Sequence, residues 1–214
     1  MSDRLQGFYS KLYLSEKHDS PDVSRVSLSR KIIKTLKAGI PNNEILNIGS
    51  GPQAIEKQIW SMNENLLLSQ FNFSTIDIAK INYKKLLKRA TSNINHSQAS
   101  ALSLPYNENS FGLVFSNHAI DFLARSAFDE AFRVLKSGGS AIFYFHHPDM
   151  IPDDISVVRN IEIRNFWSHL KETDHLFSSE QQIVNEMSDH GFGIRSIELN
   201  SDDRDKWWEV ELTK

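Results

Sequence analysis

The sequence contains no cysteine among its 214 residues. This absence excludes disulfide bonds, a thiolate nucleophile and a zinc site held by cysteine. Long apolar runs are also missing, and none approaches the roughly 20 residues that a helix needs to span a bilayer. The polar residues 1–6 are not followed by the apolar stretch of a signal peptide. We therefore expect a soluble, cytoplasmic protein without a membrane partner.

Strong charge of either sign is lacking too. The chain has 24 Lys and Arg against 27 Asp and Glu, a formal net charge of −3, and 40% of its residues are apolar. Such a balance gives no global attraction to nucleic acid. The length and the apolar share suit a single α/β domain with a sizeable core. The expected partner is a small molecule, and the sequence indicates no oligomeric state.

Glycine is sparse, but two of the nine glycines lie two positions apart behind a short apolar run. Residues 45–48 read ILNI, which is typical of a buried strand, and GSG at 49–51 breaks the run before a helical pattern. The two glycines permit a tight turn without a Cβ beside a ligand, and free N–H groups at the helix start attract polar or anionic groups. A nucleotide-like ligand could lie here, although the same pattern also serves a plain strand-to-helix connection.

Strands and helices alternate along the remaining chain. Strands are expected at 45–48, 71–78, 94–98, 111–116 and 141–145, with helices at 54–60, 81–90 and 126–136, the last capped by Gly138 and Gly139. A helix at 179–190 precedes two alternating segments, 194–199 and 207–212. This order predicts a doubly wound, Rossmann-like α/β fold with a seven-stranded sheet that is mostly parallel and has a C-terminal antiparallel hairpin.

The chain is predicted to divide near residue 40. Residues 1–40 are expected to form an N-terminal cap segment and a helix that starts at Ser20-Pro21 and presents the apolar face Val23, Val26, Ile33 and Leu36. Residues 41–214 form the α/β domain. Its irregular insert, 148–177, would lie at the ligand-facing edge of the sheet, so we expect it to act as a lid.

Four segments together resemble one enzyme family. Residues 46–52 read LNIGSGP, residues 75–79 read TIDIA, residues 101–114 read ALSLPYNENSFGLV, and residues 133–139 read RVLKSGG. Their order and spacing resemble the motifs of class I S-adenosylmethionine-dependent methyltransferases over roughly residues 44–214. The resemblance implies S-adenosyl-L-methionine as cofactor and methyl transfer to an oxygen or nitrogen of a small-molecule acceptor. A nicotinamide-dependent dehydrogenase fits less well, because the third glycine of its fingerprint is missing.

The resemblance also implies where the cofactor binds. The glycine turn would pass beneath its methionine portion, and Asp77 would accept hydrogen bonds from both ribose hydroxyls, as an acceptor-only carboxylate can. Ile78 would pack on the adenine face. The implied cofactor-binding set is Asn47, Gly49, Ser50, Gly51, Asp77, Ile78, Ser100, Ala101 and Asn117.

Four positions depart from the family pattern. Asn47, Ser100 and Gly112 stand where acidic residues are usual, and Gln53 stands where a glycine is usual. Two lost charge-assisted bonds would weaken cofactor binding on the order of tenfold to a hundredfold. The departures motivate an alternative, a catalytically inactive methyltransferase-like protein that serves as a binding or regulatory partner.

Three histidines follow strands at the expected acceptor site. Methyl transfer to an oxygen or a protonated nitrogen needs alignment of the reactants and a base with a near-neutral pKa. His118 follows the 111–116 strand, and His146 and His147 follow the 141–145 strand. We predict that one of them is the general base, the alternative for each being a solvated or hydrogen-bonded loop histidine. No metal site is expected, because the histidines lack a tight ligand spacing.

Overall fold

The computed structural model describes residues 10, 23–62, 64–80, 93–120, 123, 125–158, 161–171, 176–202 and 206–214. Three expectations lie outside the described residues: the N-terminal cap segment before residue 23, apart from residue 10, the helix start at Ser20-Pro21 and the helix at 81–90. Within these ranges, no helix combines the length and the hydropathy needed to cross a membrane.

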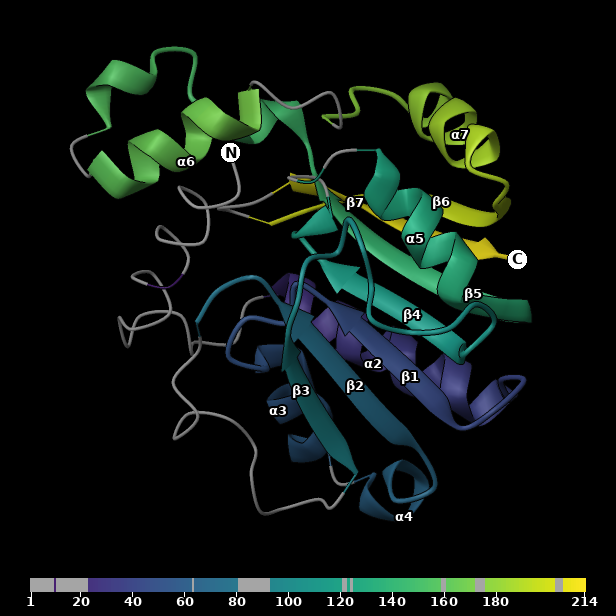
Figure 1. Cartoon of the computed structure of the whole chain (residues 1–214). Helices are drawn as coiled ribbons and strands as arrows, with labels where there is room; N and C mark the ends of the chain where they lie inside the picture. Colours follow the sequence, from purple (N-terminus) through teal and green to yellow (C-terminus); the bar gives the residue numbers. More distant parts are fainter. Residues whose placement is uncertain are drawn as a thin grey trace.

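Seven strands form one sheet in the order β3-β2-β1-β4-β5-β7-β6 (Figure 1). The strands are β1 Glu44–Ile48, β2 Asn72–Asp77, β3 Ile94–Gln98, β4 Phe111–Asn117, β5 Leu135–His146, β6 Gly193–Ser201 and β7 Lys206–Thr213. The first five pair in parallel, and β7 pairs antiparallel with β5 and β6. The predicted fold class is therefore confirmed. Strand order reverses between β1 and β4, where doubly wound sheets bind ligands.

Helices cover both faces of the sheet (Figure 1). Apolar residues of α2 (Val23–Ala38), α3 (Ala54–Ser61) and α4 (Asn65–Leu68) share one core, on what we call the α2/α3 face. Those of α5 (Ser126–Val134) and α7 (Glu180–Asp189) share the other, on the α5/α7 face. Strand side chains alternate between the faces. Ile45 lies in the α2/α3 core and Leu46 and Ile48 in the α5/α7 core, which places Asn47 on the α2/α3 face.

The predicted apolar face of helix α2 is confirmed at Ile33 and Leu36 but not at its start. Leu28, Ile32 and Leu36, spaced four apart, are buried together with Ile33. Val23 is 54% exposed, so its place on the predicted face was wrong. Residues at i, i+4 and i+8 lie on one stripe, and this stripe of larger side chains determines the contact. The helix ends at Ala38, directly before Gly39, which has a φ of 97°.

The junction between α5 and β5 also differs from the prediction. The helix ends at Val134 and the strand begins at Leu135, so Gly138 and Gly139 lie inside β5 and do not cap the helix. Leu135 pairs with Phe111 and Ser140 with Leu113, which leaves residues 136–139 opposite Gly112 alone. The glycines serve this bulge, where Gly138 has a φ of 75°.

The same junction explains why position 112 carries no acidic side chain. A Cβ on Gly112 would lie 2.8 Å from the carbonyl oxygen of Asn42 and 2.7 Å from its Oδ1. The Asn42 Nδ2 atom donates a hydrogen bond to the Ser110 carbonyl oxygen at 2.8 Å, which fixes this close approach. Glycine at 112 is thus a packing requirement of this chain.

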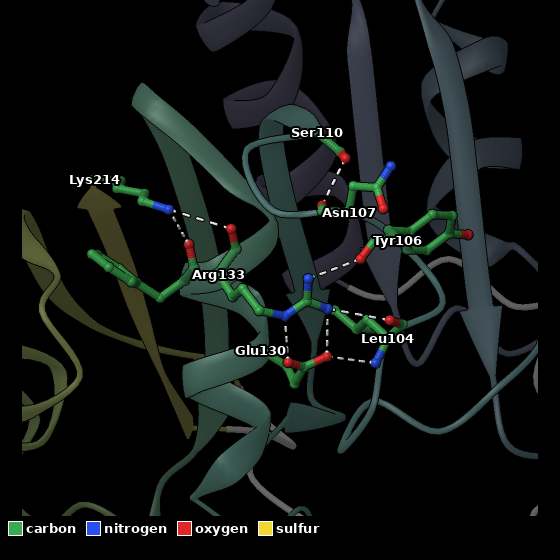
Figure 2. Close-up of polar contacts among 8 residues, drawn as sticks. Leu104, Tyr106, Asn107, Ser110, Glu130, Arg133 and Lys214 are labelled. Carbon is green, nitrogen blue, oxygen red and sulfur yellow. Dashed lines mark hydrogen bonds and ion pairs between the residues drawn. The ribbon is translucent and has the colours of Figure 1, made fainter.

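Glu130 and Arg133 tie α5 to the segment before β4 (Figure 2). The Arg133 guanidinium donates to Glu130 Oε1 at 2.6 Å and to the Tyr106 carbonyl oxygen at 2.8 Å, while Glu130 Oε2 accepts from the Leu104 amide at 2.6 Å. The hydrogen bond from Arg133 is the main cause that lowers the pKa of Glu130. These bonds fix the approach of the chain to the central strand β4.

The insert at 148–177 has more regular structure than expected. It contains two short 3-10 turns, Pro148–Met150 and Ile155–Val157, and the helix α6, Ile161–Lys171. Ile151 and Leu170 form the centre of a small separate core within it. Figure 1 shows α6 beyond one end of β5. The carboxyl end of β5 leads directly into this insert.

Candidate cofactor and acceptor site

The glycine turn follows β1 at the point where strand order reverses. Gly49, Gly51 and Gln53 have φ values of 71°, 50° and 62°. The Gly49 and Ser50 amides both donate to the Ile76 carbonyl oxygen at 2.9 Å. A Cβ on Gly49 would lie 2.2 Å from the Cβ of Ala119, in the segment after β4. The turn therefore packs directly on the end of β2 and on the loop that follows β4.

Asp77 ends β2 beside this turn and is 5% exposed. Its Oδ2 accepts a hydrogen bond from the Gly51 amide at 2.8 Å, and its Oδ1 accepts one from the Ala79 amide at 2.7 Å. Burial raises the pKa of this carboxyl group, and the two backbone bonds act in the opposite direction. Each carboxylate oxygen can accept a second hydrogen bond. The carboxylate thus fixes the turn and retains capacity for a ligand's hydroxyl groups.

Gln53 stands where the methyltransferase pattern usually has a glycine, and the backbone of the turn still has the conformation that a glycine would allow. Its φ of 62° lies in the left-handed region, which costs a residue with a Cβ about 1 kcal/mol or more. Its buried side chain donates from Nε2 to Thr75 Oγ1 at 3.1 Å, and Thr75 Oγ1 lies 2.9 Å from His96 Nδ1. The side chain is thereby held against β2, and the backbone keeps the course that glycine would give it.

Asn47 forms a buried pair with Glu56, in the first turn of α3. The Asn47 Nδ2 atom donates to Glu56 Oε1 at 2.7 Å, and the two residues are 1% and 0% exposed. Burial raises the pKa of the Glu56 carboxyl group to about 7, while the bond from Asn47 acts in the opposite direction. Sequence reasoning missed Glu56, because an acidic residue in a first helical turn is already explained by the helix dipole.

Glu56 should make the stability of the protein depend on pH. Its pKa is about 7 in the folded state and ordinarily 4.5, so the folded protein holds its proton more tightly than the unfolded chain. Between these values the free energy of unfolding should fall as pH rises, by on the order of 3 kcal/mol in total. Glu56→Gln cannot ionise and should lose this dependence. Urea unfolding of both proteins at about pH 5 and about pH 8 measures it.

Asp77 and His96 also have shifted pKa values, but both are present in the wild type and the variant. Their contributions cancel when the two stability curves are subtracted. If the free energies of unfolding of the wild type and Glu56→Gln changed equally between about pH 5 and about pH 8, Glu56 would have an ordinary pKa in the folded protein.

The predicted adenine-side residues lie next to Asp77. The Ala99 amide donates to the Asp77 carbonyl oxygen at 3.1 Å, and Gln98 Nε2 donates to the Ile78 carbonyl oxygen at 3.2 Å. These bonds join the segments that follow β2 and β3. The Ser100 hydroxyl accepts from the Leu102 amide at 3.2 Å. Ser100 and Ala101 therefore follow directly on a segment bonded to Asp77 and Ile78.

The structure brings together two of the three predicted catalytic histidines. His118 has a φ of 51°, and its amide donates to the Tyr144 carbonyl oxygen at 3.1 Å. Its ring centroid lies 4.3 Å from that of His146, which is 7% exposed. The His146 ring lies 6.4 Å from the ring of Trp167, on α6. The ends of β4 and β5 and the insert thus meet at this histidine pair.

His147 has different surroundings. Its ring lies 5.7 Å from that of Trp208, a residue of the α5/α7 core. Its Nδ1 atom accepts a hydrogen bond from the Asp149 amide at 3.2 Å, at the start of a 3-10 turn. Burial is the main cause that lowers the pKa of the imidazole, followed by the charge of Lys206. The contacts of His147 hold the start of the insert.

Comparison with known proteins identifies the domain. Residues 46–143 match the family model of a methyltransferase domain. No curated protein sequence matches the chain. The matched segment contains the glycine turn, Asp77 and the strand that ends at Asn117.

Solved structures share the fold at low sequence identity. A S-adenosylmethionine-dependent methyltransferase from Aquifex aeolicus has a TM-score of 0.59 and 15% identity, with 89% of this chain and 93% of that chain covered. Geranyl diphosphate C-methyltransferase from Streptomyces coelicolor A3(2) has a TM-score of 0.61 and 12% identity, covering 87% and 78%. The cyclase SpnF has a TM-score of 0.64 and 14% identity, covering 88% and 80%.

The matched domain and the fold agree with the sequence motifs. The domain match spans the segments that follow β1 and β2, and the sheet has the strand order and the terminal hairpin expected from those motifs. Residues 46–143 are thus similar to a methyltransferase domain, and the chain has the fold of class I S-adenosylmethionine-dependent methyltransferases.

Proposed function

We propose that this protein binds S-adenosylmethionine and transfers its methyl group to an oxygen or nitrogen of a small-molecule acceptor. The observation that carries the proposal is the hydrogen bond from the Gly51 amide to Asp77 Oδ2. It places the carboxylate proposed for the ribose hydroxyls beside the turn proposed for the methionine portion. Both parts of a cofactor site therefore lie together, although four motif positions depart from the family pattern.

The surroundings of the departures favour a working site over an inactive relative. Gln53 keeps a left-handed backbone and Gly112 is required by the approach of Asn42, so neither change alters the turn itself. At position 47, the amide is paired with the carboxylate of Glu56. A catalytically inactive methyltransferase-like protein that acts as a binding or regulatory partner remains the second candidate. The remaining arguments for it are Ser100 and the missing charge at position 47.

We assign the acceptor to the ends of β4 and β5. When bound, the cofactor supplies a sulfonium-activated methyl group. We assign to one of His118 and His146 the role of general base, which takes the proton that an acceptor hydroxyl or protonated amine loses as its bond to the methyl carbon forms and the carbon–sulfur bond breaks. The insert at 148–177, through Trp167, would cover the acceptor and exclude water. We assign the choice of acceptor to this insert and the segment before residue 23.

Calorimetric titration with S-adenosylmethionine and S-adenosylhomocysteine tests the proposal directly. We expect binding in the micromolar range, followed by transfer of a labelled methyl group in a screen of small hydroxyl- and amine-bearing acceptors. His118→Asn and His146→Asn should lower turnover by roughly a hundredfold, the usual contribution of a general base, without weakening cofactor binding. No heat and no thermal shift at millimolar cofactor would overturn the assignment.

A further inference from the structure

Three buried oxygen atoms lie without a hydrogen-bond donor around the glycine turn. They are Asn47 Oδ1, Glu56 Oε2 and Asn117 Oδ1, and each is shielded from solvent and unpartnered within the part of the chain that the structure describes. Buried polar atoms are rarely left without a partner. Three unsatisfied acceptors in one region therefore indicate a donor that binds there.

The strand register places these residues together. Asn47 on β1 is the Cα partner of Phe115 on β4, and Asn117 lies two positions further along β4. Leu113 and Phe115 lie in the α2/α3 core, so Asn117 shares that face with Asn47. Strand spacing and rise put the two Cα atoms on the order of 8 Å apart, within reach of two amide side chains. Glu56 is bonded to Asn47 on the same side.

The chemistry of the three atoms matches a primary ammonium group. When Glu56 is ionised all three are acceptors, and the bond from Asn47 Nδ2 to Glu56 Oε1 holds the Asn47 amide with its oxygen available. An ammonium group carries three N–H donors and a positive charge. Only Glu56 among the three residues can supply the opposite charge. A neutral ligand or a water molecule would leave the ionised form of this carboxylate without compensation.

We propose that Asn47, Glu56 and Asn117 bind the ammonium group at the amino-acid end of the cofactor, with Glu56 supplying the negative charge that position 47 lacks. This inference rests on the proposed function and identifies a cofactor-binding residue outside the glycine motif. Asn117 is half-buried and is the most accessible of the three residues. The raised pKa of Glu56 fits a carboxylate that is uncompensated until a cation arrives.

Two ligands that differ in the ammonium group test the proposal. S-adenosylhomocysteine carries it, and 5′-methylthioadenosine keeps the nucleoside and the sulfur without the amino-acid end. In Glu56→Gln, we expect the affinity for S-adenosylhomocysteine to fall about tenfold or more and the affinity for methylthioadenosine to change less than about twofold. Glu64→Gln, a partly exposed residue paired with Lys37 outside the site, is the matched control and should change neither.

An exchange variant separates charge from packing. The double variant Asn47→Asp with Glu56→Gln keeps one carboxylate and one amide in contact. The negative charge then lies at position 47 on β1 and no longer at position 56 on α3. The double variant should recover most of the affinity for S-adenosylhomocysteine that Glu56→Gln loses. Thermal unfolding checks that each variant is folded.

Other results of these titrations would contradict the role of Glu56, the ammonium site or the proposed function, and they can be told apart. Equal losses for both ligands, or no loss for either, would overturn the role of Glu56 while wild-type binding still supports the proposed function. If the wild type binds methylthioadenosine but not S-adenosylhomocysteine, the ammonium site is overturned. If the wild type binds neither ligand, the proposed function fails, and the ammonium site fails with it.

Discussion

Replacing Asp77 with alanine is expected to lower the affinity for S-adenosylhomocysteine by at least a hundredfold. The carboxylate is proposed to accept from both ribose hydroxyls, and each charge-assisted bond contributes about 1.5–3 kcal/mol. Two such bonds correspond to a hundredfold or more in the dissociation constant. The change also frees the Gly51 and Ala79 amides, which now donate to this carboxylate. Calorimetric titration of the variant beside the wild type measures the loss.

Two further variants separate the ribose contact from the support of the turn. Asp77→Asn keeps the size of the side chain and one acceptor oxygen, but it loses the charge and presents N–H groups on the other side. It should retain more thermal stability than Asp77→Ala and still bind poorly. Asp129→Ala removes an exposed carboxylate that contacts His190, away from the site, and should bind normally. Wild-type affinity in Asp77→Ala would contradict the placement of the ribose at the end of β2.

The sheet could be predicted from the sequence because its strands are short apolar runs separated by helices. Even β3, whose sequence INHSQ is polar, was located correctly, and it pairs in parallel with β2. The insert was predicted to be irregular because Phe166, Trp167 and His169 stand among polar residues. Helix α6 packs its apolar side on a small local core, which periodicity over so short a segment does not reveal.

The limits of prediction at the site have a different physical origin. The αβ junction at Leu135 was misplaced because two successive glycines look like a helix cap, and only pairing with β4 shows that they belong to a bulge. The place of Asp77 at the end of β2 was expected from its motif, and its contact with the ribose stays a prediction. Glu56 could not be predicted, because its importance comes from full burial against Asn47, nine positions earlier in the chain. Motif comparison by position cannot detect a buried carboxylate that lies on another element.

Replacing Gly49 with alanine is expected to destabilise the protein by about 4 kcal/mol. The added Cβ would lie 2.2 Å from the Cβ of Ala119, far closer than real Cβ contacts, and Gly49 has a φ of 71°. Overpacking in a closed site costs about 1–3 kcal/mol, and the left-handed backbone costs about 1–2 kcal/mol for a residue with a Cβ. Urea unfolding of the variant and the wild type measures the change.

A double-mutant cycle with Ala119→Gly divides this loss into its two causes. Removing the Ala119 Cβ leaves only its Cα at 3.7 Å from the added methyl group, an ordinary contact. The double variant should therefore be more stable than the sum of the single changes predicts, by about 2–3 kcal/mol, while the backbone cost at position 49 persists. Additive losses would mean that the turn after β1 moves away from Ala119. The contact between the loops after β1 and β4 would then not fix the glycine turn beneath the cofactor.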